Sequence, residues 1–315
     1  MHCNGGAHLW SDSWTWKFNM LVETLCYWAV PVFFMLSGAT LMNYRERYTT
    51  KEFFKRRLLR TLIPFIIWSF IGAIYFRVNP LHIGIIEFIN RFLNTSLMVR
   101  IFWFFPCLFT IYLAMPALSL LKDNRKVLWY LAIGGFILNT LIPWSLAFIG
   151  IQWNGAFNMQ IVAGSIIFAV LGYLFSTHEF TSKQKVLVYT LAIVVVLLRY
   201  FGTLYLSKES GTLNQAFWGD INQVPLACGV FLFFKNNKFI ASTLSKEKPA
   251  KVLKKLSSCS LGIYLCHYIV YSILSKYIVL HPIVEGILFP FIVYVVSLVI
   301  VLILKKIPVV KYSVP

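Results

Sequence analysis

Long apolar segments recur along the whole sequence and are separated by short polar connections. An α-helix needs about 20 such residues to cross a hydrocarbon layer about 30 Å thick. The segments do not alternate between apolar and polar residues, so the pattern is not that of a transmembrane β-barrel. The pattern predicts an all-α fold, a polytopic membrane helical bundle forming a single domain over 1–315 with no soluble domain. Nine spans are predicted, at 25–43, 61–78, 101–121, 127–148, 158–176, 186–204, 218–234, 257–279 and 285–304.

Composition agrees with a membrane protein. Hydrophobic residues make up 59% of the sequence and charged residues only 13%, whereas roughly a quarter of a soluble domain is charged. The formal net charge is +18, from 29 basic and 11 acidic residues. In a soluble protein this charge would suggest nucleic acid, but between apolar spans Lys and Arg mark cytoplasmic connections. We therefore expect no nucleic-acid partner. The six cysteines show neither a metal-ligand spacing nor a disulfide framework, and we expect no metal site.

The positions of the basic residues predict the orientation in the membrane. Alternate connections, including 44–60, 235–256 and the C-terminal residues, hold 22 of the 29 Lys and Arg, and the opposite side holds 7, counting Arg199 in the outer half of its span. The C-terminus and the 44–60 connection are thus predicted to be cytoplasmic. Nine spans then place Met1 outside, although the first residues lack the basic and apolar regions of a signal peptide. We expect that an upstream span is missing from this sequence.

The most informative stretch joins the first two predicted spans. An apolar run ends in Ser37-Gly38, a segment rich in Lys and Arg follows, and a second apolar run opens at Pro64. Arg57 and Arg60 stand at i and i+3, so on an α-helix they share a face. Two guanidiniums can bind a phosphate group in bidentate fashion; the alternative is that these charges contact anionic lipid headgroups. Ser37 is either an acyl relay or part of a small Ser-Gly pair for close helix packing.

Ionisable groups are few within the apolar runs and are site candidates, because such groups are costly in lipid. Glu23 and Asp220 lie near the starts of spans, where the alternative is a side chain that reaches water. Arg199 either orients a substrate or extends to the membrane interface. His267 lies beside Tyr264 in mid-helix, where a hydrogen-bonded structural histidine is the alternative.

Several motifs carry a resemblance to a known family. The run VPVFFMLSGATL, the basic segment, Arg57-x-x-Arg60 and Pro64 resemble the second and third helices of the membrane acyltransferase-3 family. The stretch Phe102-Trp103-Phe104-Phe105, running on to Tyr112 and Pro116, is similar to the family's WF…Y…P helix. Gly172-Tyr173, closing a span, and Ser258-x-Ser260-Leu261-Gly262-Ile263-Tyr264-Leu265-x-His267 resemble two later helices. The resemblance extends in order from His2 to about Lys306.

The resemblance implies a ten-span O-acyltransferase of bacterial surface glycans in the plasma membrane. Such an enzyme would move an acyl group, here expected to be acetyl, from cytoplasmic acyl-CoA to a hydroxyl of a surface polysaccharide or its lipid-linked precursor. Acetyl-CoA would be the co-substrate, with no bound cofactor, and Arg57 and Arg60 would hold the CoA phosphates. Membrane lipid, acyl-CoA and the glycan acceptor are the expected partners.

The family's first helix carries an Arg and, about three turns later, a His that acts as catalytic base. That His matches His2, and the matching Arg would precede Met1. We therefore expect the 315-residue chain to be nearly inactive as written, whether through a misplaced gene start or a real loss. Candidates for positioning the acceptor or acyl group are Glu23, Ser37, Trp103, Arg199, Tyr264 and His267. The rival interpretation is a transporter or flippase for a glycolipid or small anion, although the sequence shows no inverted repeat or matching pair of broken spans.

Overall fold

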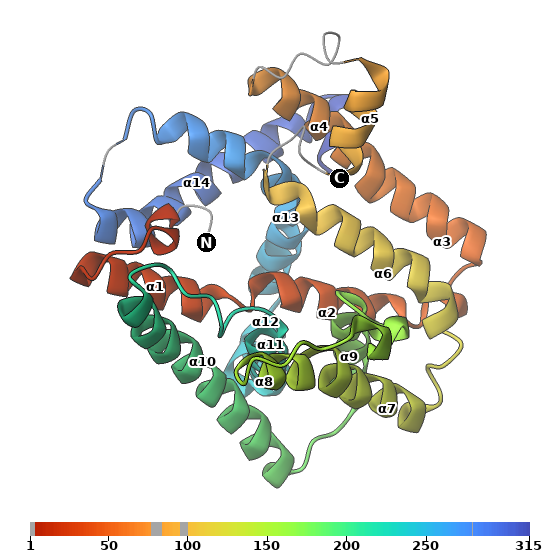
Figure 1. Cartoon of the computed structure of the whole chain (residues 1–315). Coiled ribbons are helices and arrows are strands. Elements are labelled where there is room, and N and C mark those ends of the chain that lie inside the picture. The colour runs from red at the N-terminus through yellow and green to blue at the C-terminus, as the bar shows by residue number, and fades with distance from the viewer. Residues whose placement is uncertain (1–3, 77–83, 95–99, 279) are drawn as a thin grey trace. The chain divides into compact units, whose positions relative to one another are not determined.

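The computed structural model describes residues 4–76, 84–94, 100–278 and 280–315. Every regular element among these residues is a helix (Figure 1), which confirms the all-α prediction. The described residues fall into two compact units. The first contains residues up to Thr50 together with Cys107–Asn237, and the second contains Lys51–Pro106 and Lys238–Pro315.

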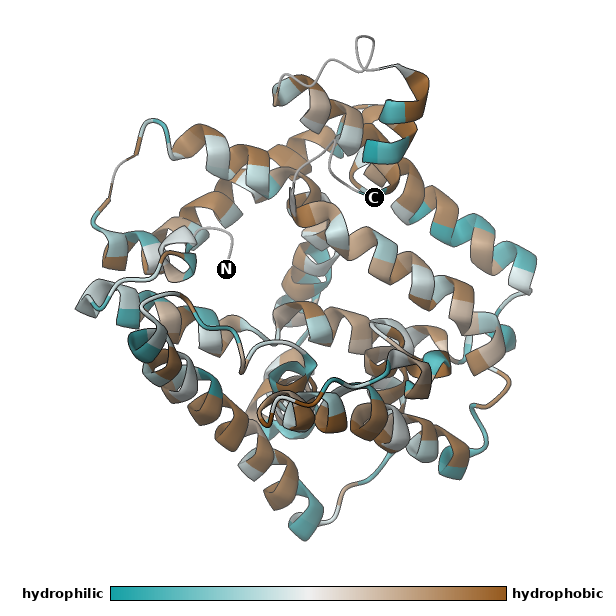
Figure 2. Cartoon of the chain, viewed as in Figure 1, coloured by the Kyte–Doolittle hydropathy of each residue, from teal (hydrophilic) through white to brown (hydrophobic). Residues whose placement is uncertain are grey.

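Seven helical segments in the described part are long and apolar enough to cross a membrane. Each overlaps one of the predicted spans, and the two with the highest mean hydropathy are α10 (Ser182–Ser210) and α14 (Pro282–Leu304). Figure 2 shows α10 apolar along most of its length and hydrophilic at its ends. The segments are Trp14–Glu46, Thr50–Tyr75, Ile101–Leu118, Arg125–Ala147, Ser182–Ser210, Glu247–Leu274 and Pro282–Leu304.

The predicted count of nine spans is not confirmed. The predicted span 158–176 overlaps α9 (Ile166–Thr177), a helix of only 12 residues that follows two short 3₁₀ turns. The predicted span 218–234 overlaps α11 (Asp220–Asn236), which has 17 residues. Nearly all of α9 is buried within the protein. Hydropathy alone cannot distinguish a residue that faces lipid from one that packs against another helix.

The first unit is built around α2 (Ala29–Leu41), which packs against α9 and α11. α10 packs against α11 and against α1 (Trp14–Cys26). The remaining helices of this unit are α6 (Phe104–Leu118), which continues from the second unit, α7 (Arg125–Phe136) with a π turn at Ile137–Leu141, and α8 (Ile142–Ala147).

Two glycines allow α2 and α9 to cross with their backbones in contact. A Cβ atom at Gly38 would lie 1.8 Å from the carbonyl oxygen of Ala169, and one at Gly172 would lie 1.9 Å from that of Met35. Small residues at a helix crossing permit this close approach. The Ser-Gly and Gly-Tyr motifs of the sequence therefore meet at one crossing, each glycine facing the backbone of the other helix.

Gly38→Ala and Gly172→Ala are expected to destabilise the protein strongly. Overpacking typically costs about 1–3 kcal/mol, and here the added methyl group meets backbone, which no side-chain rotation can relieve. Thermal unfolding in detergent should show a lower melting temperature and a smaller monodisperse fraction for both variants. Gly155→Ala is the matched control, since the nearest atom to its Cβ, on Asn158, would be 3.8 Å away. Melting temperatures equal to that of the control would contradict the tight crossing.

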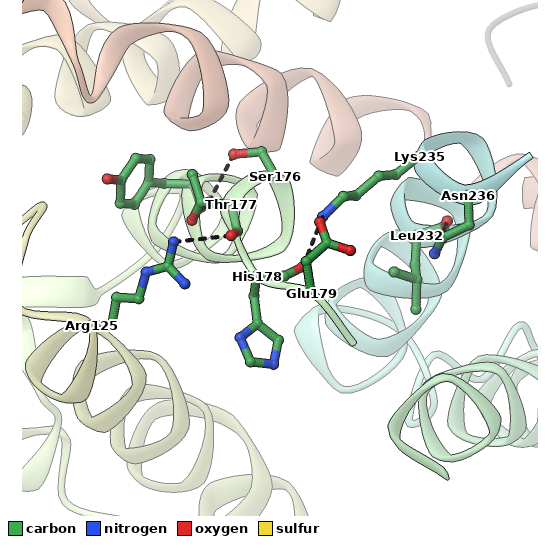
Figure 3. A network of polar contacts seen from close by, with 9 residues as sticks. Arg125, Ser176, Thr177, His178, Glu179, Leu232, Lys235 and Asn236 are labelled. Carbon is green, nitrogen blue, oxygen red and sulfur yellow. Dashed lines mark hydrogen bonds and ion pairs between the residues drawn. The ribbon is translucent and has the colours of Figure 1, made fainter. Parts of the chain in front are cut away.

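The C-terminal end of α9 is held by basic side chains from two other helices (Figure 3). A terminal nitrogen of Arg125, on α7, donates to the carbonyl oxygen of Thr177 over 3.0 Å. Nζ of Lys235, on α11, donates to the carbonyl oxygen of His178 over 2.7 Å and to Glu179 over 3.3 Å. The last carbonyls of a helix lack partners within the helix, and cations there also complement its dipole.

Two further basic side chains, Arg45 and Lys122, make contacts at the same end of the unit. We call these two residues, together with Arg125 and Lys235, the basic clamp. Arg45 donates to the carbonyl oxygen of Pro116 over 3.1 Å. Lys122 forms an ion pair with Glu46, which raises the pKa of the Lys122 ammonium group. Through these contacts and those of Arg125 and Lys235, four of the connections predicted to be cytoplasmic are joined to one another. The structure thus groups the connections in the way that the charge count predicts.

The second unit contains α3 (Thr50–Arg57), a π turn at Leu58–Leu62, α4 (Ile63–Tyr75) and α5 (Ile85–Leu93). From the C-terminal part it has α12 (Lys238–Leu244), α13 (Glu247–Leu274) and α14. α13 packs against α14 and α4. The indole nitrogen of Trp68 donates to the carbonyl oxygen of Ser313 over 2.9 Å, so the C-terminal segment is fixed against α4.

Candidate functional site

The two predicted phosphate ligands lie where α3 passes into α4. α3 ends at Arg57, and Arg60 lies within the π turn that precedes Pro64. Proline has no N–H, and its ring clashes with the carbonyl group four residues earlier, which here belongs to Arg60. The helix accommodates the ring by widening into a π turn. The π turn at Ile137–Leu141 precedes a proline in the same way, so proline alone accounts for this geometry.

The π turn changes how the two guanidiniums are presented. Arg57 is half-buried, with its guanidinium carbon 5.8 Å from the centre of the Phe53 ring, whereas Arg60 is exposed. A π turn has a wider repeat than an α-helix, so Arg60 is rotated away from the position expected from i, i+3 spacing. The prediction of a shared α-helical face therefore requires correction, while both side chains stay at the basic end of α4.

A second group of candidates lies on α13. The Tyr264 hydroxyl donates to the carbonyl oxygen of Ile101, and its ring centre lies 5.0 Å from that of Phe104. His267 Nδ1 lies 2.7 Å from the carbonyl oxygen of Tyr264 and 3.2 Å from that of Ile263. A carbonyl oxygen only accepts, so these contacts assign the hydrogen to Nδ1.

The aromatic motif around Trp103 contacts Tyr264 through its phenylalanines. The rings of Phe102, Phe104 and Phe105 all lie within 6.5 Å of Tyr264, centre to centre. The Trp103 side chain is instead 46% exposed. The structure thus brings two of the sequence motifs together in the second unit, with the phenylalanines rather than Trp103 forming the contact.

Ser37 has a local hydrogen bond. Its hydroxyl donates to the carbonyl oxygen of Phe33, one turn earlier on α2, over 3.1 Å. Such a bond satisfies a serine within a helix without a further partner. Together with the crossing at Gly38, it favours the packing interpretation of Ser37 over an acyl relay.

Arg199 is fully buried in the first unit, with 0% of its surface exposed. Its guanidinium carbon lies 3.2 Å from the centre of the Tyr27 ring and 4.3 Å from that of Trp218. The indole nitrogen of Trp218 donates to Thr203 Oγ1 over 3.2 Å. The alternative in which Arg199 extends to the membrane interface is therefore wrong, because the guanidinium is enclosed by aromatic rings.

Glu23 lies one helical turn before Tyr27 and belongs to the same cluster. It is 1% exposed, which rules out the alternative of a side chain that reaches water, and its charge acts on Arg199. We call Glu23, Tyr27, Arg199, Thr203 and Trp218 the arginine cage. The sequence interpretation missed Tyr27, Thr203 and Trp218. Tyr27 follows Glu23 by four residues and Thr203 follows Arg199 by four, so each pair shares a helix face and could have been found from the sequence. No local signal connects Trp218 to them.

The candidate site residues are divided between the two units. Glu23, Ser37 and Arg199 belong to the first unit, and Arg57, Arg60, Trp103, Tyr264 and His267 belong to the second. His2, the predicted base, lies outside the described residues. Among the residues that are described, no three His, Cys, Asp or Glu side chains are grouped so as to hold a metal ion.

Comparison with known proteins gives one match. A family model described as an acyltransferase domain, acyltransferase family 3, matches residues 1–306, which span both units. No curated protein and no solved structure matches the chain. Because the family model covers nearly the whole sequence, the chain belongs to the acyltransferase-3 family.

Proposed function

We propose that the protein is an O-acyltransferase that moves an acetyl group from cytoplasmic acetyl-CoA to a hydroxyl of a surface polysaccharide or its lipid-linked precursor. The observation that carries this proposal is the family match over residues 1–306. The seven long apolar helices support a membrane location, which we propose to be the bacterial plasma membrane with the C-terminus in the cytoplasm.

The donor site is assigned to the junction of α3 and α4. An acyl-CoA carries several phosphate charges, and guanidiniums bind phosphate through paired N–H donors. Arg57 and Arg60 lie in the connection that the charge count assigns to the cytoplasm, where CoA is available. Their position at the junction of α3 and α4, close in sequence to Lys55 and Arg56, gives the phosphates a cationic surface.

The transfer step requires a base. A sugar hydroxyl is a weak nucleophile until its proton is removed, and a histidine has a pKa suited to this near neutral pH. We assign this role to His2. The imidazole takes the hydroxyl proton, the oxygen attacks the thioester carbonyl, and the C–S bond breaks to release CoA, whose thiolate then takes up a proton.

The test is release of free thiol from acetyl-CoA by the purified protein in detergent. Thiol release should depend on the protein and increase when a bacterial surface polysaccharide is added, with radiolabelled acetyl appearing in the polysaccharide. A transporter or flippase for a glycolipid or small anion would release no thiol. If the protein, reconstituted in vesicles, carries a glycolipid or small anion across the membrane and releases no thiol, the acyltransferase proposal is contradicted and the transporter alternative is favoured.

A further inference from the structure

We propose that the arginine cage binds a hydroxyl of the acceptor sugar next to the one that is acetylated, and that it recognises a neutral sugar rather than an anionic group. This inference rests on the proposed acyltransferase function and specifies its acceptor side. Glu23 and Arg199 are the side chains that bind the hydroxyl, and Tyr27 and Trp218 hold Arg199 in place.

The cage contains buried polar atoms that the protein does not satisfy. By distance and angle, none of the three side-chain nitrogens of Arg199 forms a hydrogen bond with another described residue, although the Tyr27 side chain interacts with the guanidinium. Oε2 of Glu23 has no such partner either. Both residues are almost completely buried. Burying a charged group without hydrogen bonds is costly, and native proteins rarely leave such groups unpaired. Unsatisfied donors and an unsatisfied acceptor in one cluster indicate that a polar group from outside the chain binds there.

The chemistry of the two side chains selects a hydroxyl. Arg199 can only donate hydrogen bonds, and an ionised Glu23 can only accept them. A hydroxyl does both, accepting from the guanidinium and donating to the carboxylate. The pair is balanced in charge, so an anion would be repelled by Glu23 and a cation by Arg199. The rings of Tyr27 and Trp218 both lie against the guanidinium, and in this proposal its N–H groups are the donors to the ligand.

The cage lies far from the basic clamp along α10. In this proposal it is on the outer side, where the acceptor would be available. Arg199 follows the start of α10 at Ser182 by 17 residues, about 25 Å of helix, and the start of α10 follows the clamp. The Tyr200 hydroxyl donates to the carbonyl oxygen of Lys17 over 3.3 Å, in a segment that the charge count assigns to the outer side. The His8 ring, at the end of the 3₁₀ turn Gly5–His8, lies 5.6 Å from Trp218, centre to centre, so a second part of this segment contacts the cage.

The experiment compares Arg199→Lys and Glu23→Gln with Ser207→Ala in the complete protein. Ser207 is buried on the same face of α10, two turns after Arg199, and accepts from the backbone N–H of Asn214. Methyl glycosides of neutral hexoses serve as acceptors, and two quantities are measured: the KM for glycoside in thiol release, and the rise in melting temperature that glycoside produces. Both cage variants should raise the glycoside KM at least about tenfold and lose the rise in melting temperature, while the KM for acetyl-CoA is unchanged. Ser207→Ala should leave both KM values unchanged.

The outcomes separate this inference from the proposed function. If glycosides raise the melting temperature of the wild type but not of the cage variants, and no thiol is released, the proposed subsite is supported and the proposed acyl transfer is contradicted. If both variants only lower the melting temperature and the glycoside effects persist, the cage is a structural cluster filled by water and the inference is wrong. It is equally overturned if glycosides affect neither the melting temperature nor the thiol release of the wild type. Glu23→Gln preserves the shape of the side chain, so it remains informative if Arg199→Lys fails to fold.

Discussion

Replacing Arg57 or Arg60 by alanine is expected to weaken acetyl-CoA binding between tenfold and a hundredfold. Each lost hydrogen bond to a charged group costs about 1.5–3 kcal/mol, and about 1.4 kcal/mol corresponds to a factor of ten in affinity. Lysine at either position should restore binding only in part, since an ammonium group lacks the planar fork of the guanidinium. Equilibrium binding of labelled acetyl-CoA to the detergent-purified protein measures the effect without requiring turnover.

Arg56→Ala is the matched control for this pair. Arg56 lies next to Arg57, and its Nε is 2.9 Å from Glu52, to which it is already paired. Its removal changes the number of positive charges on the segment by the same amount. If the segment only attracts anionic headgroups, all three substitutions should have similar small effects on acetyl-CoA binding. Unchanged binding in a folded Arg57→Ala/Arg60→Ala double variant would remove the proposed CoA site.

The sequence predicts the helices of this protein well because lipid imposes a simple rule. A backbone in hydrocarbon must satisfy its own hydrogen bonds, so long apolar runs become helices, as Ser182–Ser210 and Pro282–Leu304 did. α9 is also a helix, but most of its residues are buried within the protein and it packs against α2. Hydropathy contains no information on which apolar surface is covered by another helix.

The candidate site was predictable only where its residues are close in sequence. Arg57 and Arg60 were found from their spacing, but their relative orientation was not, because the effect of Pro64 on the helix lies outside a simple α-helical repeat. The arginine cage is formed by segments more than 170 residues apart, from Glu23 to Arg199. A single sequence shows that each of these groups is unusual in an apolar run, but not that they meet.

The general base is assigned to His2 by family resemblance, and the structure bears on its rival, His267. The Nδ1 atom of His267 is bonded to carbonyl oxygens of its own helix, at Tyr264 and Ile263. Such bonds to the backbone are typical of a histidine that stabilises the local structure of its helix, here α13. We therefore expect His267→Ala to lower the melting temperature more than it lowers the turnover of molecules that remain folded.

His2→Ala should instead reduce acetyl transfer by about a hundredfold to ten-thousandfold, the usual contribution of a positioned acid–base group. Acetyl-CoA binding should not change, since the phosphate ligands Arg57 and Arg60 belong to the connection assigned to the cytoplasm, and the base must act on the acceptor at the outer side. The pH profile supplies a second readout. An unperturbed histidine has a pKa of about 6.5, so a reaction that needs the neutral imidazole should slow as the pH falls below that value, and His2→Ala should lose this dependence. Normal turnover and an unchanged acidic limb in His2→Ala, with both lost in a folded His267→Ala protein, would transfer the role of the base to His267.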